Sequence, residues 1–188
     1  MTNRQPSPAG DSDLQHLAGA LGTTRDLMAG VEREQAHLPT PCREFDVSQL
    51  LDHLVGWAVN FADKANGIEP ATDPETVTAG DHPSAEYQQA GARLIDGYRS
   101  NPDHDAHPLG IVILETVTHG WDLAVATGQA PTYSDEVIET ALAAGRRMLK
   151  PEYRGDGRPF GPELDAPTTG SALDQLVAFM GRDPHWTA

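Results

Sequence analysis

The segment from Leu109 to Gly128 holds the residues best suited to chemistry. It is strongly apolar, and its only titratable side chains are Glu115, His119 and Asp122. In a helix, a rotation of about 100° per residue places His119 about 40° from Glu115 and Asp122 about 20° to the other side. All three then share one stripe. A carboxylate and an imidazole four residues apart lie side by side on a helix, so this pair can hold one divalent metal ion.

The apolar surroundings of this stripe favour a metal site more than the spacing alone does. A helix that is apolar on most sides is buried on most sides. A buried ionised carboxylate costs several kcal/mol unless it is paired or metal-bound. The stripe must therefore face water or a compensating cation. The alternative is that Glu115 and His119 form a plain ion pair.

A metal site needs a third ligand from another element, and His53 is the best candidate. It lies in a second apolar helix, at the edge of the apolar arc and near Trp57 and Asn60. Two histidines and one carboxylate leave a coordination position open, as in catalytic zinc sites. The same ligand set also binds iron, so the residue types do not fix the metal. The alternative for His53 is a hydrogen-bonded core histidine. Trp57 and Asn60 are the predicted substrate-contacting residues, although Trp57 also suits a core position.

Two other segments carry weaker signals. The sequence Asp103-His104-Asp105-Ala106-His107 can bind a metal, but acidic loops before helices are usually solvated. Cys42 precedes a helix N-terminus, which can lower the pKa of a thiol and make it reactive; a small buried cysteine is the alternative. No P-loop, G-x-G-x-x-G, G-x-S-x-G or H-E-x-x-H motif is present, so we predict no nucleophile of those kinds.

The elements that must position these residues are all predicted to be helical. The clearest start is at Asp46, which caps a helix with Gln49 three residues later and with Phe45 and Leu50 as a hydrophobic staple. Apolar spacing and breakers predict helices over 13–37, 47–66, 84–99, 109–127, 134–150 and 171–180, with a long loop over 67–83. The fold class expected is all-α: a four-helix bundle with a short C-terminal helical extension.

Length and charge limit the remaining choices. A chain of 188 residues fits one domain at the prior of about 150 residues each. We assign it to 13–188, after a flexible tail at 1–12. The formal net charge of −15 argues against nucleic-acid and membrane-surface partners. The sequence has no uninterrupted run of about 18 apolar residues. A single cysteine and the lack of an apolar signal segment favour the cytoplasm.

Several motifs resemble a known family. They are TPC at 40–42, FDV at 45–47, LLDHLVGW at 50–57 and ETVTHGWDLA at 115–124. The tail adds FGP at 160–162, 173–179 and GRDP at 181–184. Together they resemble the DinB-like metal-binding superfamily, in the branch related to the N-terminal domain of mycothiol-dependent maleylpyruvate isomerase. The resemblance spans about residues 14–184.

This resemblance implies a DinB-like four-helix bundle with a divalent metal, usually zinc or nickel, on His53, Glu115 and His119. Family members include transferases and isomerases in which the metal activates the thiol of mycothiol, bacillithiol or a similar cofactor. This chain ends at Ala188, without the further C-terminal domain of the isomerase. We therefore do not expect maleylpyruvate isomerisation itself.

The function expected is that of a metal-dependent enzyme that activates a small thiol for transfer, addition or isomerisation on a small electrophile. Asp122 is expected to orient His119 from outside the metal's ligand set. Two alternatives stay open: a metal-dependent hydrolase, and a non-enzymatic metal-binding or sensing protein. The partner predicted is a small-molecule substrate, with a homodimer as an open alternative.

Overall fold

All regular structure is helical in the part of the chain that the structure describes. The computed structural model describes residues 10–101, 107–155 and 160–188, where the only β-pairings are two isolated bridges. This confirms the all-α prediction. The α-helices are α1 (Asp11–Ala29), α2 (Val47–Ala65), α3 (Pro83–Ser100), α4 (Leu109–Ala126), α5 (Asp135–Met148) and α6 (Ala172–Phe179). Short 3₁₀ turns are η1 (Arg33–Gln35), η2 (Pro74–Thr76) and η3 (Pro151–Tyr153).

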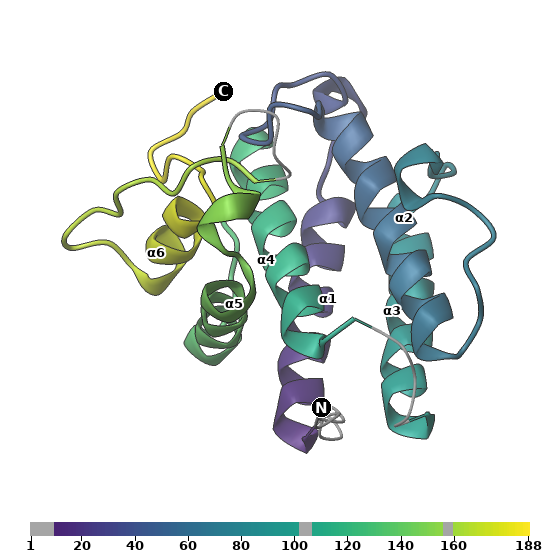
Figure 1. Ribbon diagram of the computed structural model, residues 1–188. Coiled ribbons are helices and arrows are strands. Elements are labelled where there is room, and N and C mark those ends of the chain that lie inside the picture. The colour runs from purple at the N-terminus through teal and green to yellow at the C-terminus, as the bar shows by residue number, and fades with distance from the viewer. Residues whose placement is uncertain (1–9, 102–106, 156–159) are drawn as a thin grey trace.

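Helices α1 to α4 form a bundle in which α2 packs on α3, α3 on α1 and α1 on α4 (Figure 1). Helices α2 and α3 run in the same direction, so the chain must return along the bundle between them (Figure 1). A helix of 19 residues such as α2 is roughly 28 Å long. The long predicted loop supplies this connection as residues 66–82, which we call the crossover segment. It carries η2 back against α2.

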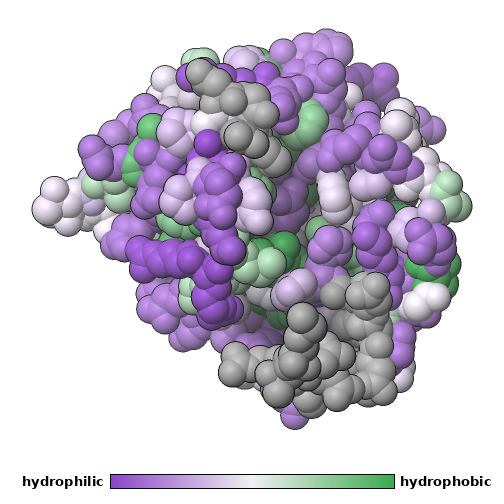
Figure 2. All heavy atoms as spheres, in the orientation of Figure 1, coloured by the Kyte–Doolittle hydropathy of each residue, from purple (hydrophilic) through white to green (hydrophobic). Residues whose placement is uncertain are grey.

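Helix α4 is the central element of the fold. It packs on α1 and α2 within the bundle and on α5 and α6 outside it, as Figure 1 shows. By length and composition it is apolar enough to cross a membrane, but 72% of it is buried inside the structure. Coverage on both sides explains why its sequence is apolar almost all round. The face of the molecule that Figure 2 shows, by contrast, is mostly hydrophilic, with scattered hydrophobic residues.

The first helix is shorter than predicted, because it ends at Ala29 and not at residue 37. Gly30 caps it, and the chain then forms η1, where Gln35 accepts a hydrogen bond from the Glu32 backbone N–H at 2.9 Å. The Gln35 side chain also donates to the Thr127 carbonyl at 3.0 Å, which ties the turn to the end of α4. The apolar spacing of Val31 therefore reflects contact with the core from a turn, not from a helix.

The last two residues assigned to the flexible tail are helical. Asp11 and Ser12 lie within α1, and residues 1–9 lie outside the described residues. The other helix boundaries differ from the predicted ones by one or two residues. The division into a tail and one domain stays a prediction.

A buried hydrogen bond joins α1 to the segment after α4. The hydroxyls of Thr24 and Tyr133 lie 2.7 Å apart, and Thr24 Oγ1 also donates to the Thr116 carbonyl at 3.2 Å. These groups pack directly against Gly120 on α4, where an added Cβ would overlap Tyr133 Oη. Gly120 is therefore required by close packing, within the same motif that carries His119.

A pair of glycine substitutions tests this packing. We expect Gly120→Ala to destabilise the fold by about 1–3 kcal/mol, because the methyl group overpacks the core. Gly22→Ala in α1 should instead stabilise it by about 0.4–1 kcal/mol, because a helix favours alanine and nothing lies within 4 Å of the added Cβ. Urea unfolding of both variants measures the difference. Equal effects of the two substitutions would contradict the packing argument.

Candidate metal centre

Three side chains predicted as metal ligands come together between α2 and α4. The Nε2 atom of His53 lies 3.0 Å from Glu115 Oε1, and the Nε2 atom of His119 lies 3.2 Å from the same oxygen. The ligand atoms of all three lie within 4.8 Å of one another. Both histidines are buried, and the Glu115 side chain is 26% exposed. Two imidazole nitrogens thus face one carboxylate oxygen.

The start of α2 sets the position of His53. The Asp46 side chain accepts a hydrogen bond from the Gln49 backbone N–H at 2.9 Å, and the Gln49 side-chain oxygen accepts one from the Asp46 backbone N–H at 2.9 Å. This is the predicted capping box, and it fixes the helix about two turns before His53. Phe45, just before the cap, packs its ring 4.7 Å from the His53 ring. Capping and packing together hold the imidazole toward α4.

Each histidine has a second carboxylate on its Nδ1 side. Asp122 Oδ2 lies 3.0 Å from His119 Nδ1, at ion-pair distance but without hydrogen-bond geometry. Glu75 Oε2 lies 3.2 Å from His53 Nδ1. Metal-bound histidines characteristically have such a carboxylate behind the ring, which fixes the tautomer and leaves the other nitrogen to the metal.

Sequence analysis missed Glu75. It lies in η2 of the crossover segment, 22 residues from His53 in the chain. No helical spacing relates two residues that far apart across a loop. The only local signal is the Asp73-Pro74-Glu75 turn, in which Asp73 Oδ1 accepts from the Glu75 N–H at 3.1 Å.

Asp122 is fully buried and paired with Arg182, which follows α6. Arg182 Nη2 lies 3.0 Å from Asp122 Oδ2, and Arg182 Nε lies 3.3 Å from Oδ1. At Asp122, the compensating cation predicted for the stripe on α4 is thus the guanidinium of Arg182. Sequence analysis quoted Arg182 within a motif but gave it no role, because nothing in the sequence indicates that α6 returns to α4.

The charges of this centre are strongly coupled. Burial alone would raise the pKa of Glu115, but the neighbouring His119 and His53 hold it well below its usual range. Burial would lower the pKa of His119, but the Glu115 charge outweighs it and raises that pKa to about 9. Burial would likewise raise the pKa of Asp122, and the Arg182 charge more than offsets this and lowers it.

The donor set fits a divalent cation. Both ring nitrogens of His53 face a carboxylate oxygen, Nδ1 that of Glu75 at 3.2 Å and Nε2 that of Glu115 at 3.0 Å. A neutral imidazole carries one N–H, so a ring that donates to Glu75 through Nδ1 leaves the lone pair of Nε2 facing Glu115 Oε1, and two acceptors repel each other at this distance. A proton or a metal ion must lie between them. Two imidazoles and one carboxylate are ligands that zinc and nickel accept.

The predicted substrate-contacting residues differ in their surroundings. Trp57 is half-buried, with its ring 6.2 Å from that of His53, and its indole N–H donates to Glu75 Oε1 at 2.7 Å. Asn60 is buried, and its Oδ1 has no hydrogen-bond partner among the described residues. Their contact with a substrate stays a prediction.

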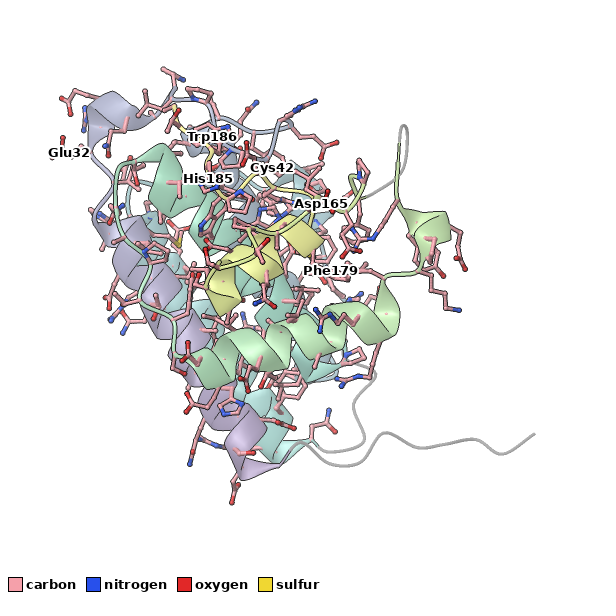
Figure 3. All side chains as sticks on the ribbon, turned by 90° about the vertical axis from the view of Figure 1, so that its left-hand side faces the viewer. Glu32, Cys42, Asp165, Phe179, His185 and Trp186 are labelled. Atoms are coloured by element: carbon pink, nitrogen blue, oxygen red, sulfur yellow. The ribbon has the colours of Figure 1, made fainter. Side chains whose placement is uncertain are left out.

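The reactive interpretation of Cys42 is wrong. Burial raises the pKa of its thiol to about 11, and the nearby Arg182 offsets this only in part. Figure 3 shows Cys42 at the same end of the molecule as His185 and Trp186. Cys42 also lies within 4.8 Å of His119 and Asp122 ligand atoms, but Arg182 already contacts both oxygens of Asp122, so a second cation would be repelled there.

The acidic loop before α4 can be assessed only in part. Asp103, His104 and Asp105 lie outside the described residues. The ring of His107 packs 5.2 Å from that of Phe61 and 6.4 Å from that of Trp57. A metal site in this loop stays a prediction.

A polar cleft leads from the surface to His53. It has a volume of about 240 Å³ and lies between the first half of α2 and the crossover segment. The residues that line it are Glu44, Phe45, Gln49, Asp52, His53, Glu75, Thr76, Val77 and Thr78. Three of them carry carboxylates and none is a lysine or an arginine, so the cleft is negatively charged. On the inner side of the centre, His53 and Glu115 border a narrow apolar cavity between the helices.

The buried pair gives a pH-dependent prediction. The folded-state pKa of Asp122 is below its unfolded value of 3.8, so its stabilisation is present above that value and is lost as the pH falls further. We expect Asp122→Asn to cost about 3–5 kcal/mol at neutral pH, because Arg182 is left buried without its partner. The difference in free energy of unfolding between this variant and the wild type should narrow below about pH 4. Urea unfolding between pH 2.5 and 7 measures it.

The matched control is Asp96→Asn, on a side chain that is 75% exposed. It should change stability by at most about 0.5 kcal/mol at any pH. If the difference in free energy of unfolding between Asp122→Asn and wild type stays constant from pH 2.5 to 7, the role of the buried pair is refuted.

Comparison with known proteins places this chain in a family. The family model described as mycothiol maleylpyruvate isomerase N-terminal domain matches residues 17–107, which include His53 but not Glu115 or His119. Two relatives from Mycobacterium tuberculosis are Uncharacterized protein MT0763 (strain CDC 1551 / Oshkosh) and Uncharacterized protein Rv0738 (strain ATCC 25618 / H37Rv). Each is 34% identical over 175 residues, covering 83% of this chain and 90% of the relative.

No solved structure gave a significant match to the chain. The family is metal-binding, and the structure groups histidine and carboxylate side chains that can hold a metal. On the family model and the two relatives together, the chain belongs to the family of the mycothiol maleylpyruvate isomerase N-terminal domain, a branch of the DinB-like metal-binding helical bundles.

Proposed function

We propose that this protein is a divalent-metal enzyme that activates a low-molecular-weight thiol, such as mycothiol, toward a small electrophile. The carrying observation is that the Nε2 atoms of His53 and His119 both face Glu115 Oε1, at 3.0 and 3.2 Å. Each ring also has a carboxylate beside its Nδ1 atom. This is the donor set of a three-ligand site with a position left open.

The bound metal, zinc or nickel, supplies a Lewis acid that lowers the pKa of a thiol and so yields a nucleophile at neutral pH. The residues of this chain hold and balance that charge. Two neutral imidazoles and the Glu115 carboxylate leave one positive charge of a divalent ion uncompensated, which favours an anionic sulfur ligand. Asp122, held by Arg182, keeps the His119 ring directed at the centre.

The cleft beside His53 is the route for the small molecules. Its three carboxylates repel a dianionic substrate, so we do not propose isomerisation of maleylpyruvate. Gln49 and the hydroxyls of Thr76 and Thr78 suit a neutral, hydroxyl-rich cofactor. A cytoplasmic location and a homodimer stay predictions from the sequence, and the small-molecule substrate is part of this proposal.

The metal is tested first, by calorimetry with zinc and nickel. We expect one ion to bind per chain, and Glu115→Gln to weaken binding by at least about 100-fold, because it removes the only anionic ligand. At a metal concentration 100 times Kd, binding adds about 2.7 kcal/mol of stability. A chelator should therefore lower the Tm of the metal-loaded wild type but not of His119→Ala. An equal shift in both proteins would show that the metal binds elsewhere.

The thiol is tested on the zinc-loaded protein. We expect mycothiol to bind one to one by calorimetry, with affinity lost when the zinc is removed or when His53 is replaced by Ala. Ester hydrolysis without thiol affinity would identify a hydrolase. A loaded site with neither thiol affinity nor turnover on thiol and ester panels would identify a metal-binding or sensing protein.

A further inference from the structure

We propose that Glu75, on the crossover segment, is a positioning residue that sets His53 to bind the metal through Nε2. This inference rests on the proposed function and adds a residue from outside the helices to its machinery. Glu75 contacts His53 on the ring nitrogen opposite the one that faces Glu115. It therefore acts on the metal through His53 and not as a ligand.

The orientation of the Glu75 carboxylate is fixed by Trp57. An indole N–H can only donate, so the 2.7 Å contact from Trp57 Nε1 must end on an acceptor, Glu75 Oε1. The other oxygen, Oε2, is left for His53 Nδ1 at 3.2 Å. Because a carboxylate oxygen accepts, Nδ1 must donate to it, and a neutral ring that donates through Nδ1 can bind a metal ion only through Nε2. The motif His53-Leu54-Val55-Gly56-Trp57 thus supplies both partners of one carboxylate.

Three contacts deliver Glu75 to this position. Asp73 caps the η2 turn by accepting from the Glu75 N–H at 3.1 Å. The Ala79 N–H donates to Asp52 Oδ1 at 2.8 Å, which fastens the crossover segment to α2 beyond the turn. At Gly56 an added Cβ would overlap the Pro74 carbonyl oxygen, so only glycine allows η2 to lie this close to α2. This close approach explains why the residue at position 56, between His53 and Trp57, is a glycine.

Charge alone does not explain the position of Glu75. Glu44 lines the same cleft and carries the same charge, but no hydrogen bond links it to His53 among the described residues. Glu75 uses each oxygen on a different nitrogen donor although its side chain is 48% exposed. Removing the Glu44 carboxylate tests the effect of the negative charge of the cleft, whereas positioning requires the two contacts of Glu75.

The test compares Glu75→Ala, Glu75→Gln and Glu44→Gln, each as the full chain. Zinc affinity is measured by competition with a chromophoric chelator. We expect Glu75→Ala to lose about 10–100-fold in affinity, as for removal of other carboxylates behind metal-bound histidines. Glu75→Gln should lose less, because its carbonyl oxygen replaces one of the two carboxylate oxygens as an acceptor, whereas the NH2 group in place of the other oxygen can only donate. Glu44→Gln removes the same charge from the cleft and should stay within about twofold of wild type.

A second measurement separates positioning from a merely structural role. Nitrogen-15 NMR of the histidine rings in zinc-loaded wild type should show His53 bound through Nε2, with a slowly exchanging proton on Nδ1. In Glu75→Ala that proton should exchange rapidly with water, while the His119 signals are unchanged.

The proposal is overturned if Glu75→Ala binds zinc within twofold of wild type. It is equally overturned if Glu44→Gln loses as much affinity as Glu75→Gln, or if His53 binds zinc through Nδ1. A wild-type protein that binds no zinc would overturn the proposed function as well. Zinc binding without thiol affinity would overturn the proposed function and leave the role of Glu75 standing.

Discussion

The structure depends on one constraint, which is the carboxylate of Glu115 in the middle of an apolar helix. Helix α4 packs on four other helices, so its polar side chains need partners that the helix itself cannot supply. His119, one turn further along, and His53 from α2 both direct Nε2 at the same oxygen. The desolvation of this acid is thus offset by groups from two helices, and a divalent ion among them would complete that compensation.

The outer parts of the fold serve the same centre. The crossover segment is long because α2 and α3 run in the same direction, and its return path takes Glu75 to the Nδ1 side of His53. The C-terminal turn after α6 brings Arg182 to Asp122, on the Nδ1 side of His119. Each histidine is therefore supported by a segment that is not part of the bundle. The Pro74 carbonyl oxygen approaches Gly56, and the Tyr133 hydroxyl approaches Gly120, more closely than a Cβ atom would allow. The two glycines thus let the surrounding elements pack near the two histidines.

The surroundings of the centre limit what it can act on. The open side is a negatively charged cleft, and the closed side is a narrow apolar cavity between the helices. Within the proposed function, a neutral thiol cofactor and a small, uncharged or cationic electrophile suit this combination better than a dicarboxylate does. Cys42 is a poor nucleophile because its burial raises the pKa of the thiol. The proposed function therefore assigns the reacting thiol to a bound cofactor and not to Cys42.

The sequence alone predicted most helix boundaries and the candidate metal ligands. Apolar periodicity defines α2 and α4, and the cap at Asp46 defines the start of α2. These two signals can be found in the sequence because they depend on neighbours only a few residues away. Their spacing of four residues identified Glu115 and His119 as candidate metal ligands. The neighbouring apolar helix of the predicted bundle then supplied His53 as the third candidate. Glu75 and Arg182 could be found only in the tertiary structure. Glu75 contacts His53 and Arg182 contacts Asp122, each across a loop whose path no local sequence pattern encodes. The tertiary structure also corrected the end of α1 and the state of Cys42, because both depend on which buried groups pack against them.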